Sequence, residues 1–202
     1  LVGLARGAGK GVIVAGPSPD PSDLGAAVLR FGSKTGYPVI ADPLSGARFR
    51  AGASATVVET ADLVLRDKDS QESLTPDLVI RVGSSPTSAA VQAWMEHHRG
   101  ARHIVIDDGS RWKDHGAIAT DYVRCDPAAL LDDAAGALSQ VVDPAWHRLW
   151  TDADRTAVEV LKGVGVGVGD LPEGDVLAEV AASVPTGASV FVSSSMPIRD
   201  LD

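Results

Sequence analysis

GVIVAG, at residues Gly11–Gly16, is the clearest structural signal in this chain of 202 residues. It is an unbroken apolar run rich in β-branched residues, and the turn-forming stretch Pro17–Asp20 closes it. Such a run is typical of a strand that is buried on both faces of a sheet. The next segment, Pro21 to Gly36, has apolar residues three and four positions apart, with Ser22 or Asp23 as its cap. We therefore expect a buried strand followed by a helix.

Strand-like runs and helical patterns continue to alternate along the chain. The remaining strand-like runs are 38–41, 78–82, 103–106 and 122–125, and the remaining helical patterns are 53–65, 87–98, 127–141 and 144–162. Helical segments between buried strands are long enough to be crossover connections, which join parallel strands. The sequence therefore predicts an α/β fold: a Rossmann-like, doubly wound parallel sheet covered by helices on both faces.

Glycine and valine alternate over Gly163–Gly169, which predicts a flexible joint between two domains. Beyond it, 175–184 has helical spacing and 189–192 has the apolar pattern of a buried strand. One helix and one strand cannot bury a core alone, so we expect a partial second α/β domain that is truncated. The predicted organisation is a Rossmann-like domain at 1–162, a Gly/Val linker at 163–170 and the beginning of another domain at 171–202.

Composition narrows the class of protein. The chain is 45% hydrophobic and 22% charged, with a net charge of -9 and scattered basic residues. A negative chain without a basic run is poorly suited to nucleic acid or to anionic membranes. The single cysteine, Cys125, excludes an internal disulfide and multi-cysteine metal sites, and we expect it to be buried. No apolar stretch is long enough to span a bilayer, so we expect a cytoplasmic protein.

Two stretches approach nucleotide-binding motifs but lack their defining features. Arg6–Gly11 precedes the first strand and has no Ser or Thr after its Lys, so we expect a flexible lead-in and not a phosphate loop. Pro17 and Pro19 remove backbone amides that a dinucleotide pyrophosphate needs. The five histidines lack metal-ligand spacing and are expected on the surface. Trp146 and Trp150, four apart on a helix, are expected to pack on the core.

A candidate site for a small anion lies after the predicted strand 78–82. Ser84, Ser85 and Thr87 follow that strand and open a helix, where free amides and the helix dipole favour an anion. Arg111 follows the next strand, and the carboxyl ends of adjacent parallel strands share one crevice. The alternative is that Ser85 or Thr87 only caps the helix. The residues alone leave both interpretations open.

A second constellation is SSSMPIRD at Ser193–Asp200. It places three short hydroxyl side chains and one guanidinium directly after a predicted strand, which suits the binding of a carboxylate. The alternative is a polar turn in which Arg199 pairs with Asp200 or Asp202.

The motif Ser193–Asp200 resembles the segment that begins the pyrophosphate domain of the menaquinone-pathway synthases (MenD), a family of thiamine diphosphate enzymes. Further stretches resemble landmarks of that family's middle domain in the same order, namely Gly11–Gly16, Gly36–Ser45, Val82–Thr87 and Ile104–Asp108. The resemblance covers nearly the whole chain. It implies the middle domain of an enzyme whose active sites form between two subunits, in a homodimer or homotetramer.

The resemblance also implies an activity for the full-length enzyme. Such a transferase decarboxylates 2-oxoglutarate on thiamine diphosphate, with magnesium or manganese, and adds the succinyl carbanion to isochorismate. The family's catalytic Glu and its Gly-Asp-Gly metal motif lie in other parts of the enzyme. We therefore expect this chain to hold no catalytic residue and no metal, to bind no cofactor and to be inactive alone. The alternative from another class is a stand-alone Rossmann-like module that binds a small anion.

Site residues follow from the same resemblance, position by position. The family's Arg that contacts a substrate carboxylate corresponds to Arg199, and its small polar residues correspond to Ser194 and Ser195. Ser194 replaces the Asn of several relatives, and Ala89 and Ala90 stand where relatives carry a basic residue. A middle domain without catalytic residues could still hold a feedback effector. We expect an aromatic carboxylate near the strand-end residues Ser84, Ser85, Thr87 and Arg111.

Overall fold

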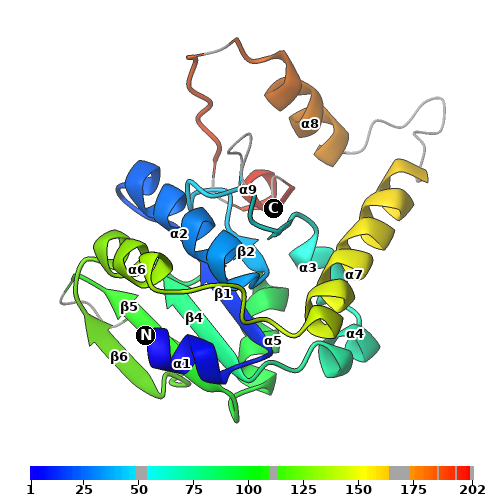
Figure 1. Ribbon diagram of the computed structural model, residues 1–202. Helices are drawn as coiled ribbons and strands as arrows, with labels where there is room; N and C mark the ends of the chain where they lie inside the picture. Colours follow the sequence, from blue (N-terminus) through cyan, green and yellow to red (C-terminus); the bar gives the residue numbers. More distant parts are fainter. Residues whose placement is uncertain (49–53, 110–112, 164–172, 186, 194, 201–202) are drawn as a thin grey trace.

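The computed structural model describes residues 1–48, 54–109, 113–163, 173–185, 187–193 and 195–200. Within these residues, a six-stranded sheet has the order β3-β2-β1-β4-β5-β6, and all neighbouring strands are parallel (Figure 1). The strands are β1 (Gly11–Ala15), β2 (Val39–Ala41), β3 (Val57–Val58), β4 (Leu78–Val82), β5 (Arg102–Asp107) and β6 (Asp121–Arg124). The chain winds outward from β1 to β3 and then from β4 to β6, which confirms the predicted doubly wound fold.

Helices cover both faces of this sheet (Figure 1). α2 packs against α6, whereas α3 contacts both α5 and α7. In the described part of the chain the helices are α1 (Val2–Gly7), α2 (Pro21–Thr35), α3 (Ala61–Val64), α4 (Lys68–Ser73), α5 (Ala89–His97), α6 (Pro127–Gly136), α7 (Pro144–Gly163), α8 (Glu173–Ser183) and α9 (Met196–Asp200). The predicted caps Ser22 and Asp23 are wrong, because α2 already begins at Pro21 with Asp20 as its N-cap.

The core is centred on β1 and β4, in which every residue is buried. Trp146 and Trp150 of α7 lie on this core with exposed fractions of 1% and 0%, which confirms their predicted role. The Trp150 ring packs edge to face against Trp94 and Trp146. The indole nitrogen of Trp146 donates to the Gly11 carbonyl at 3.1 Å, so the first half of α7 is anchored to the sheet.

Several predicted elements differ from the structure. The helix predicted at 53–65 is replaced by β3 followed by the four-residue α3. Residues 189–192 form no strand, since no described strand lies beside them to complete their backbone hydrogen bonds. The expected flexible lead-in at Arg6–Gly11 is also wrong. α1 covers its first part, and the Tyr37 hydroxyl donates to the carbonyls of Ala5 and Ala8.

Burial of single residues also corrects two expectations. His98 and His103 are buried, with exposed fractions of 9% and 0%, so the predicted surface location is wrong for two of the five histidines. The Nε2 atoms of His98 and His103 lie 2.8 and 3.0 Å from the carbonyls of Gln71 and His98. A carbonyl only accepts, so each of these nitrogens carries a hydrogen. Cys125 is half-buried and not fully buried.

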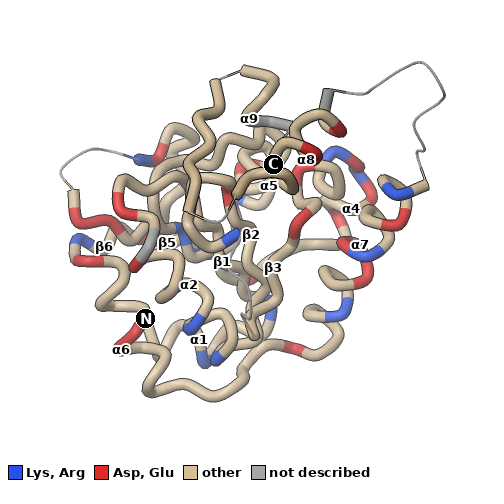
Figure 2. Tube along the Cα trace, turned by 90° about the horizontal axis from the view of Figure 1, so that it is seen from above, with Lys and Arg blue, Asp and Glu red and all other residues tan. Residues whose placement is uncertain are grey.

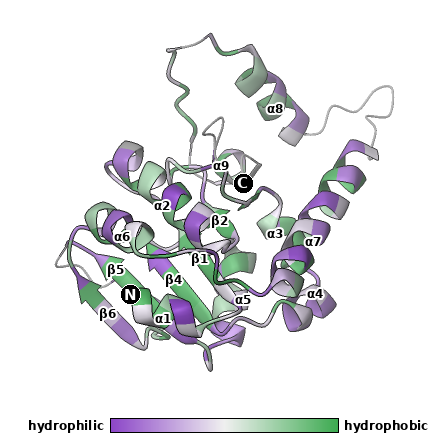
Figure 3. Ribbon diagram, viewed as in Figure 1, coloured by the Kyte–Doolittle hydropathy of each residue, from purple (hydrophilic) through white to green (hydrophobic). Residues whose placement is uncertain are grey.

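The C-terminal segment 173–200 has little core of its own. α8 contacts α9 and stands away from the sheet (Figures 1 and 3). Val176, Val180 and Phe191 have exposed fractions of 41%, 43% and 98%. The predicted Gly/Val linker at 163–170 lies outside the described residues except for Gly163, which ends α7.

The surface carries both signs of charge. Figure 2 shows Lys and Arg interspersed with Asp and Glu around the chain. Among the helices of the described residues, none combines the length and the apolar character that crossing a bilayer requires.

Candidate functional site

The crevice between β1 and β4, where doubly wound folds commonly bind ligands, is closed by backbone. The Ser84 amide, after β4, donates to the Pro17 carbonyl, after β1, at 2.8 Å. A Cβ added to Gly16 would lie 1.8 Å from the Ser84 carbonyl oxygen. Gly83 adopts a φ of 73°, which lets the chain turn at this close approach. The two loops therefore bind each other and leave no room for a pyrophosphate between them.

An internal carboxylate occupies the neighbouring amides. Asp42 follows β2 and is only 2% exposed. Its Oδ1 accepts from the Leu44 amide at 2.9 Å, and its Oδ2 accepts from the Thr87 amide at 2.7 Å. We expected the Thr87 amide to be free for an external anion, but it already donates to the Asp42 carboxylate. Sequence reasoning missed Asp42, although a lone Asp directly after a buried strand could have indicated it.

The N-cap of α5 is Ser88 and not Ser85 or Thr87. The Ser88 hydroxyl accepts from the Val91 amide at 3.1 Å and donates to Asp62 at 2.6 Å. This pair ties the start of α5 to α3. The alternative prediction, that Ser85 or Thr87 caps this helix, is therefore wrong, because Ser88 is the cap.

Two of the residues predicted for an effector, Ser85 and Thr87, line different cavities. The Ser85 hydroxyl lies 3.0 Å from His115 Nδ1, whereas Thr87 faces a different cavity described below. Arg111 lies outside the described residues. The effector site stays a prediction.

A buried ion pair lies beneath the loop that follows β5. Arg81 of β4 and Asp114 have side-chain exposures of 7% and 1%, and their atoms approach to 2.8 Å. Burial opposes ionisation of Asp114, but the Ala119 amide and Arg81 donate hydrogen bonds to it and lower its pKa overall. The second Arg81 nitrogen donates to the Lys113 carbonyl at 2.8 Å. The two charges neutralise each other, so this pair joins β4 to Lys113 and Asp114 and offers no free charge to a ligand.

A candidate binding site is a mainly apolar cavity of about 1110 Å³. One wall is formed by the loops after β2 and β4, and the other wall by the C-terminal segment. Its lining residues are Pro43, Leu44, Thr87, Leu177, Val180, Ala181, Val184, Ala188, Val190, Phe191, Val192, Ser195 and Ile198. Thr87 and Ser195 were predicted in separate sites, and the structure brings them to one cavity.

The motif Ser193–Asp200 has an unusual backbone at this cavity. Ser195 adopts a φ of 92°, which L-residues other than glycine rarely adopt. Strained residues of this kind cluster at binding sites. Met196–Asp200 forms the short helix α9, and Arg199 is part of it. The structure describes the backbone of Arg199 and not its side chain. Ser194 lies outside the described residues.

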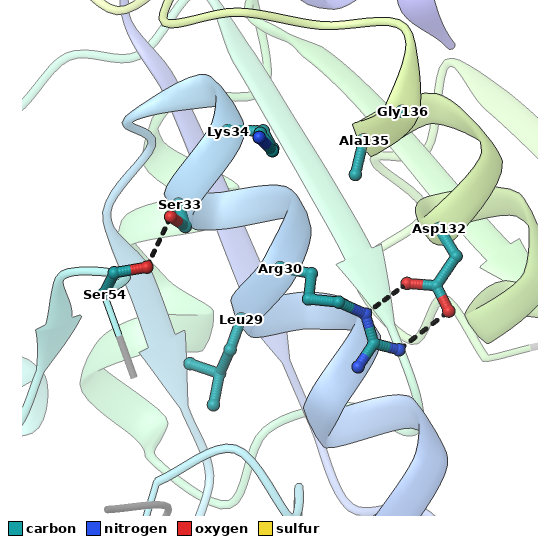
Figure 4. A pocket seen from close by; sticks show the side chains of 8 residues that line it. All are labelled: Leu29, Arg30, Ser33, Lys34, Ser54, Asp132, Ala135 and Gly136. Carbon is teal, nitrogen blue, oxygen red and sulfur yellow. Dashed lines mark hydrogen bonds and ion pairs between the residues drawn. The ribbon is translucent and has the colours of Figure 1, made fainter. Parts of the chain in front are cut away.

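A second cavity, of about 660 Å³, is a groove between α2 and α6 that polar and apolar residues line together (Figure 4). Arg30 of α2 donates two hydrogen bonds of 2.7 Å to the two oxygens of Asp132 of α6. Arg30 thereby lowers the pKa of Asp132. The Ser33 and Ser54 hydroxyls lie 2.6 Å apart across the same groove. The polar groups of the groove largely satisfy one another, so we regard it as a structural contact between two helices.

Comparison with known proteins identifies the family. A family profile described as "Middle domain of thiamine pyrophosphate" matches residues 6–192. The chain belongs to this family. The match confirms the middle-domain fold that the resemblance implied.

Several curated relatives of this chain carry the same name. Relatives from Listeria innocua, Chloroflexus aurantiacus and Geobacillus thermodenitrificans are 36%, 33% and 35% identical to it. All three are named 2-succinyl-5-enolpyruvyl-6-hydroxy-3-cyclohexene-1-carboxylate synthase, the MenD enzyme that the sequence resembles. Each alignment covers 96% of this chain and 33% of the relative. The chain thus spans about a third of the length of the curated relatives it matches.

Proposed function

We propose that this chain is part of a 2-succinyl-5-enolpyruvyl-6-hydroxy-3-cyclohexene-1-carboxylate synthase. The observation that supports the proposal is the name shared by relatives that align with 96% of the chain. The proposed organisation is a middle domain at 1–162, a linker at 163–170 and the start of the pyrophosphate domain at 171–202. The whole enzyme is a homo-oligomeric, cytoplasmic transferase of menaquinone biosynthesis, and it uses 2-oxoglutarate and isochorismate.

Thiamine diphosphate, with magnesium or manganese, supplies the electron sink for decarboxylation in the whole enzyme. The described residues of the loop after β4 do not fit that cofactor. A diphosphate needs free amides or cations, and the amides of Ser84 and Thr87 are bound to Pro17 and Asp42. Within the described residues, no group of three or more His, Cys, Asp or Glu side chains could hold a metal. We therefore assign this chain a role in substrate binding and architecture, and we expect it to be inactive alone.

The proposed substrate contacts are Ser194, Ser195 and Arg199. A guanidinium can bind a carboxylate through two parallel hydrogen bonds, and the short serine hydroxyls can add further donors. Both substrates of the proposed reaction carry carboxylates. The left-handed backbone of Ser195 supports this role, since it sets the turn from which α9 and Arg199 begin.

The alternative function, a stand-alone module that binds a small anion, has less support. Its proposed amide donors are engaged by Asp42 and by the Pro17 carbonyl. An effector that binds Ser84, Ser85, Thr87 and Arg111 is a separate proposal for the whole enzyme. Titration of that enzyme with an aromatic carboxylate tests it, since inhibition that persists unchanged in Arg111→Ala would contradict the site.

The proposed activity is tested on the full-length enzyme that contains this chain. We expect incubation with 2-oxoglutarate, isochorismate, thiamine diphosphate and magnesium to give carbon dioxide and the succinylated product, detected by mass spectrometry. Reactions that lack one substrate serve as controls. If freshly prepared isochorismate gives no product while thiamine diphosphate is bound, the assignment is wrong.

A further inference from the structure

Thr87 is one of the few polar residues that line the apolar cavity. Its amide donates to the buried Asp42 carboxylate at 2.7 Å, so the backbone position of Thr87 is fixed. Asp42 also accepts from the Leu44 amide, which binds the loops after β2 and β4 into one wall. Within the described residues, the Thr87 hydroxyl has no hydrogen-bond partner. The wall therefore offers apolar surface from Pro43 and Leu44 together with one hydroxyl.

Ser195 lies on the opposite wall of the same cavity, next to Ile198. Its hydroxyl also has no partner among the residues that the structure describes. Two such hydroxyls in a mainly apolar cavity match the usual design of a small-molecule site, in which a few polar groups orient a largely apolar ligand.

The chemistry of the wall distinguishes the two substrates of the proposed function. The product named for the relatives carries a cyclohexene ring with a hydroxyl and a carboxylate. A ring of this kind matches the apolar faces of Pro43 and Leu44, and its polar substituents match the Thr87 hydroxyl. 2-Oxoglutarate is an open-chain dicarboxylate and has no ring to bury. The wall opposite the Ser195 motif therefore suits the ring-bearing acceptor.

We propose that Thr87 is a specificity-determining residue whose hydroxyl binds the ring-bearing acceptor substrate, isochorismate. Asp42 is its positioning residue, because it fixes the Thr87 amide and the adjacent loop. This inference rests on the proposed function, and it adds a middle-domain residue to a substrate site otherwise assigned to Ser194, Ser195 and Arg199.

The test uses Thr87→Val in the full-length enzyme, since valine keeps the shape and the backbone amide and removes only the hydroxyl. We expect the KM for isochorismate to rise by about 2- to 13-fold, the range of one lost hydrogen bond between neutral groups. The KM for 2-oxoglutarate stays within about twofold of wild type, because that substrate does not use the hydroxyl. Thr87→Ser retains the hydroxyl and restores most of the affinity for isochorismate. Thr156→Val, on the exposed side of α7, is the matched control and leaves both KM values unchanged.

Two results overturn the inference. One is an unchanged KM for isochorismate in both Thr87→Val and Thr87→Ala, where the second variant guards against misfolding of the first. The other is a rise in the KM for 2-oxoglutarate instead. In both cases a wild-type enzyme that forms the product leaves the proposed function intact. A wild-type enzyme that forms no product from isochorismate overturns the proposed function and this inference together.

Discussion

The sheet and the C-terminal segment use apolar residues in opposite ways. In β1 and β4 every residue is buried, and Phe31 of α2 packs on the same core with no exposed surface. In the segment 173–200, Phe191 is 98% exposed and the apolar residues of α8 line a cavity. Stability therefore depends on the sheet, whereas three of the candidate substrate contacts, Ser194, Ser195 and Arg199, belong to a segment outside the core of the sheet. Because the stabilising core and these three contacts lie in different parts of the chain, substitutions at the contacts should leave the fold intact.

The same substitution at two phenylalanines tests this division most strongly. We expect Phe31→Ala to lower the free energy of unfolding of the chain 1–202 by about 3–5 kcal/mol, because it leaves a cavity in the core. Phe191→Ala should change it by less than about 0.5 kcal/mol, since the ring is exposed. Urea unfolding followed by tryptophan fluorescence measures both. Comparable losses in the two variants would show that the C-terminal segment is part of the stabilising core.

Two ion pairs provide a second comparison, between buried and exposed charge. Asp114→Ala leaves the buried Arg81 guanidinium unpaired and should cost about 3–5 kcal/mol. Asp152→Ala removes a pair of similar length with Arg155 on exposed α7 and should cost at most about 0.5 kcal/mol. The same urea titration applies. An Asp114→Ala variant as stable as Asp152→Ala would mean that water reaches Arg81 and that the loop after β5 is not held by this pair.

Arg199 tests the functional half of the comparison. In the full-length enzyme, Arg199→Ala should lower kcat/KM by about 30- to 1000-fold, or about 2–4 kcal/mol, through loss of a bidentate contact with a substrate carboxylate. Arg199→Lys keeps the positive charge but lacks the paired donors of a guanidinium, so its kcat/KM should lie between those of the wild type and Arg199→Ala. Steady-state kinetics with each substrate varied in turn measures the effect. Wild-type kcat/KM for both substrates in Arg199→Ala would assign the arginine a purely structural role.

The local sequence pattern was enough to predict most strands of the sheet and the packing of Trp146 and Trp150 on the core. β4 has the predicted bounds, because four of its five residues are apolar and three of these are β-branched, which gives a clear signal. The two residues of β3 are too few to form a pattern, and the segment 189–192 has a strand pattern without a neighbour to pair with. The burial of His103 could have been inferred, since it opens the apolar run of β5.

The candidate site was less accessible to sequence reasoning. Ser195 was identified through a motif and Thr87 through its place after a strand, but periodicity does not show that they face each other. The bond between Asp42 and the Thr87 amide joins two loops that only the folded sheet brings together. Such contacts depend on tertiary packing, and they decide which predicted amides remain free for a ligand.

The smallest expected effect concerns pH and again separates the sheet from the C-terminal segment, because all five histidines precede residue 148. Burial lowers the pKa of His103. The hydrogen bond to the His98 carbonyl opposes this shift, whereas the nearby Arg81 lowers the pKa further. Burial also lowers the pKa of His98. The unfolded chain takes up these protons near pH 6.5 while the folded chain does not. Stability is therefore complete above that pH and decreases as the pH falls below it, by at most about 1.4 kcal/mol per pH unit for each histidine.

Urea unfolding at pH 7.5 and 5.5 should show this loss, reduced in His103→Gln and unchanged in the matched control His115→Gln, whose histidine is exposed. A loss that His103→Gln leaves intact and His115→Gln abolishes would place the sensitivity at the surface and contradict the assignment.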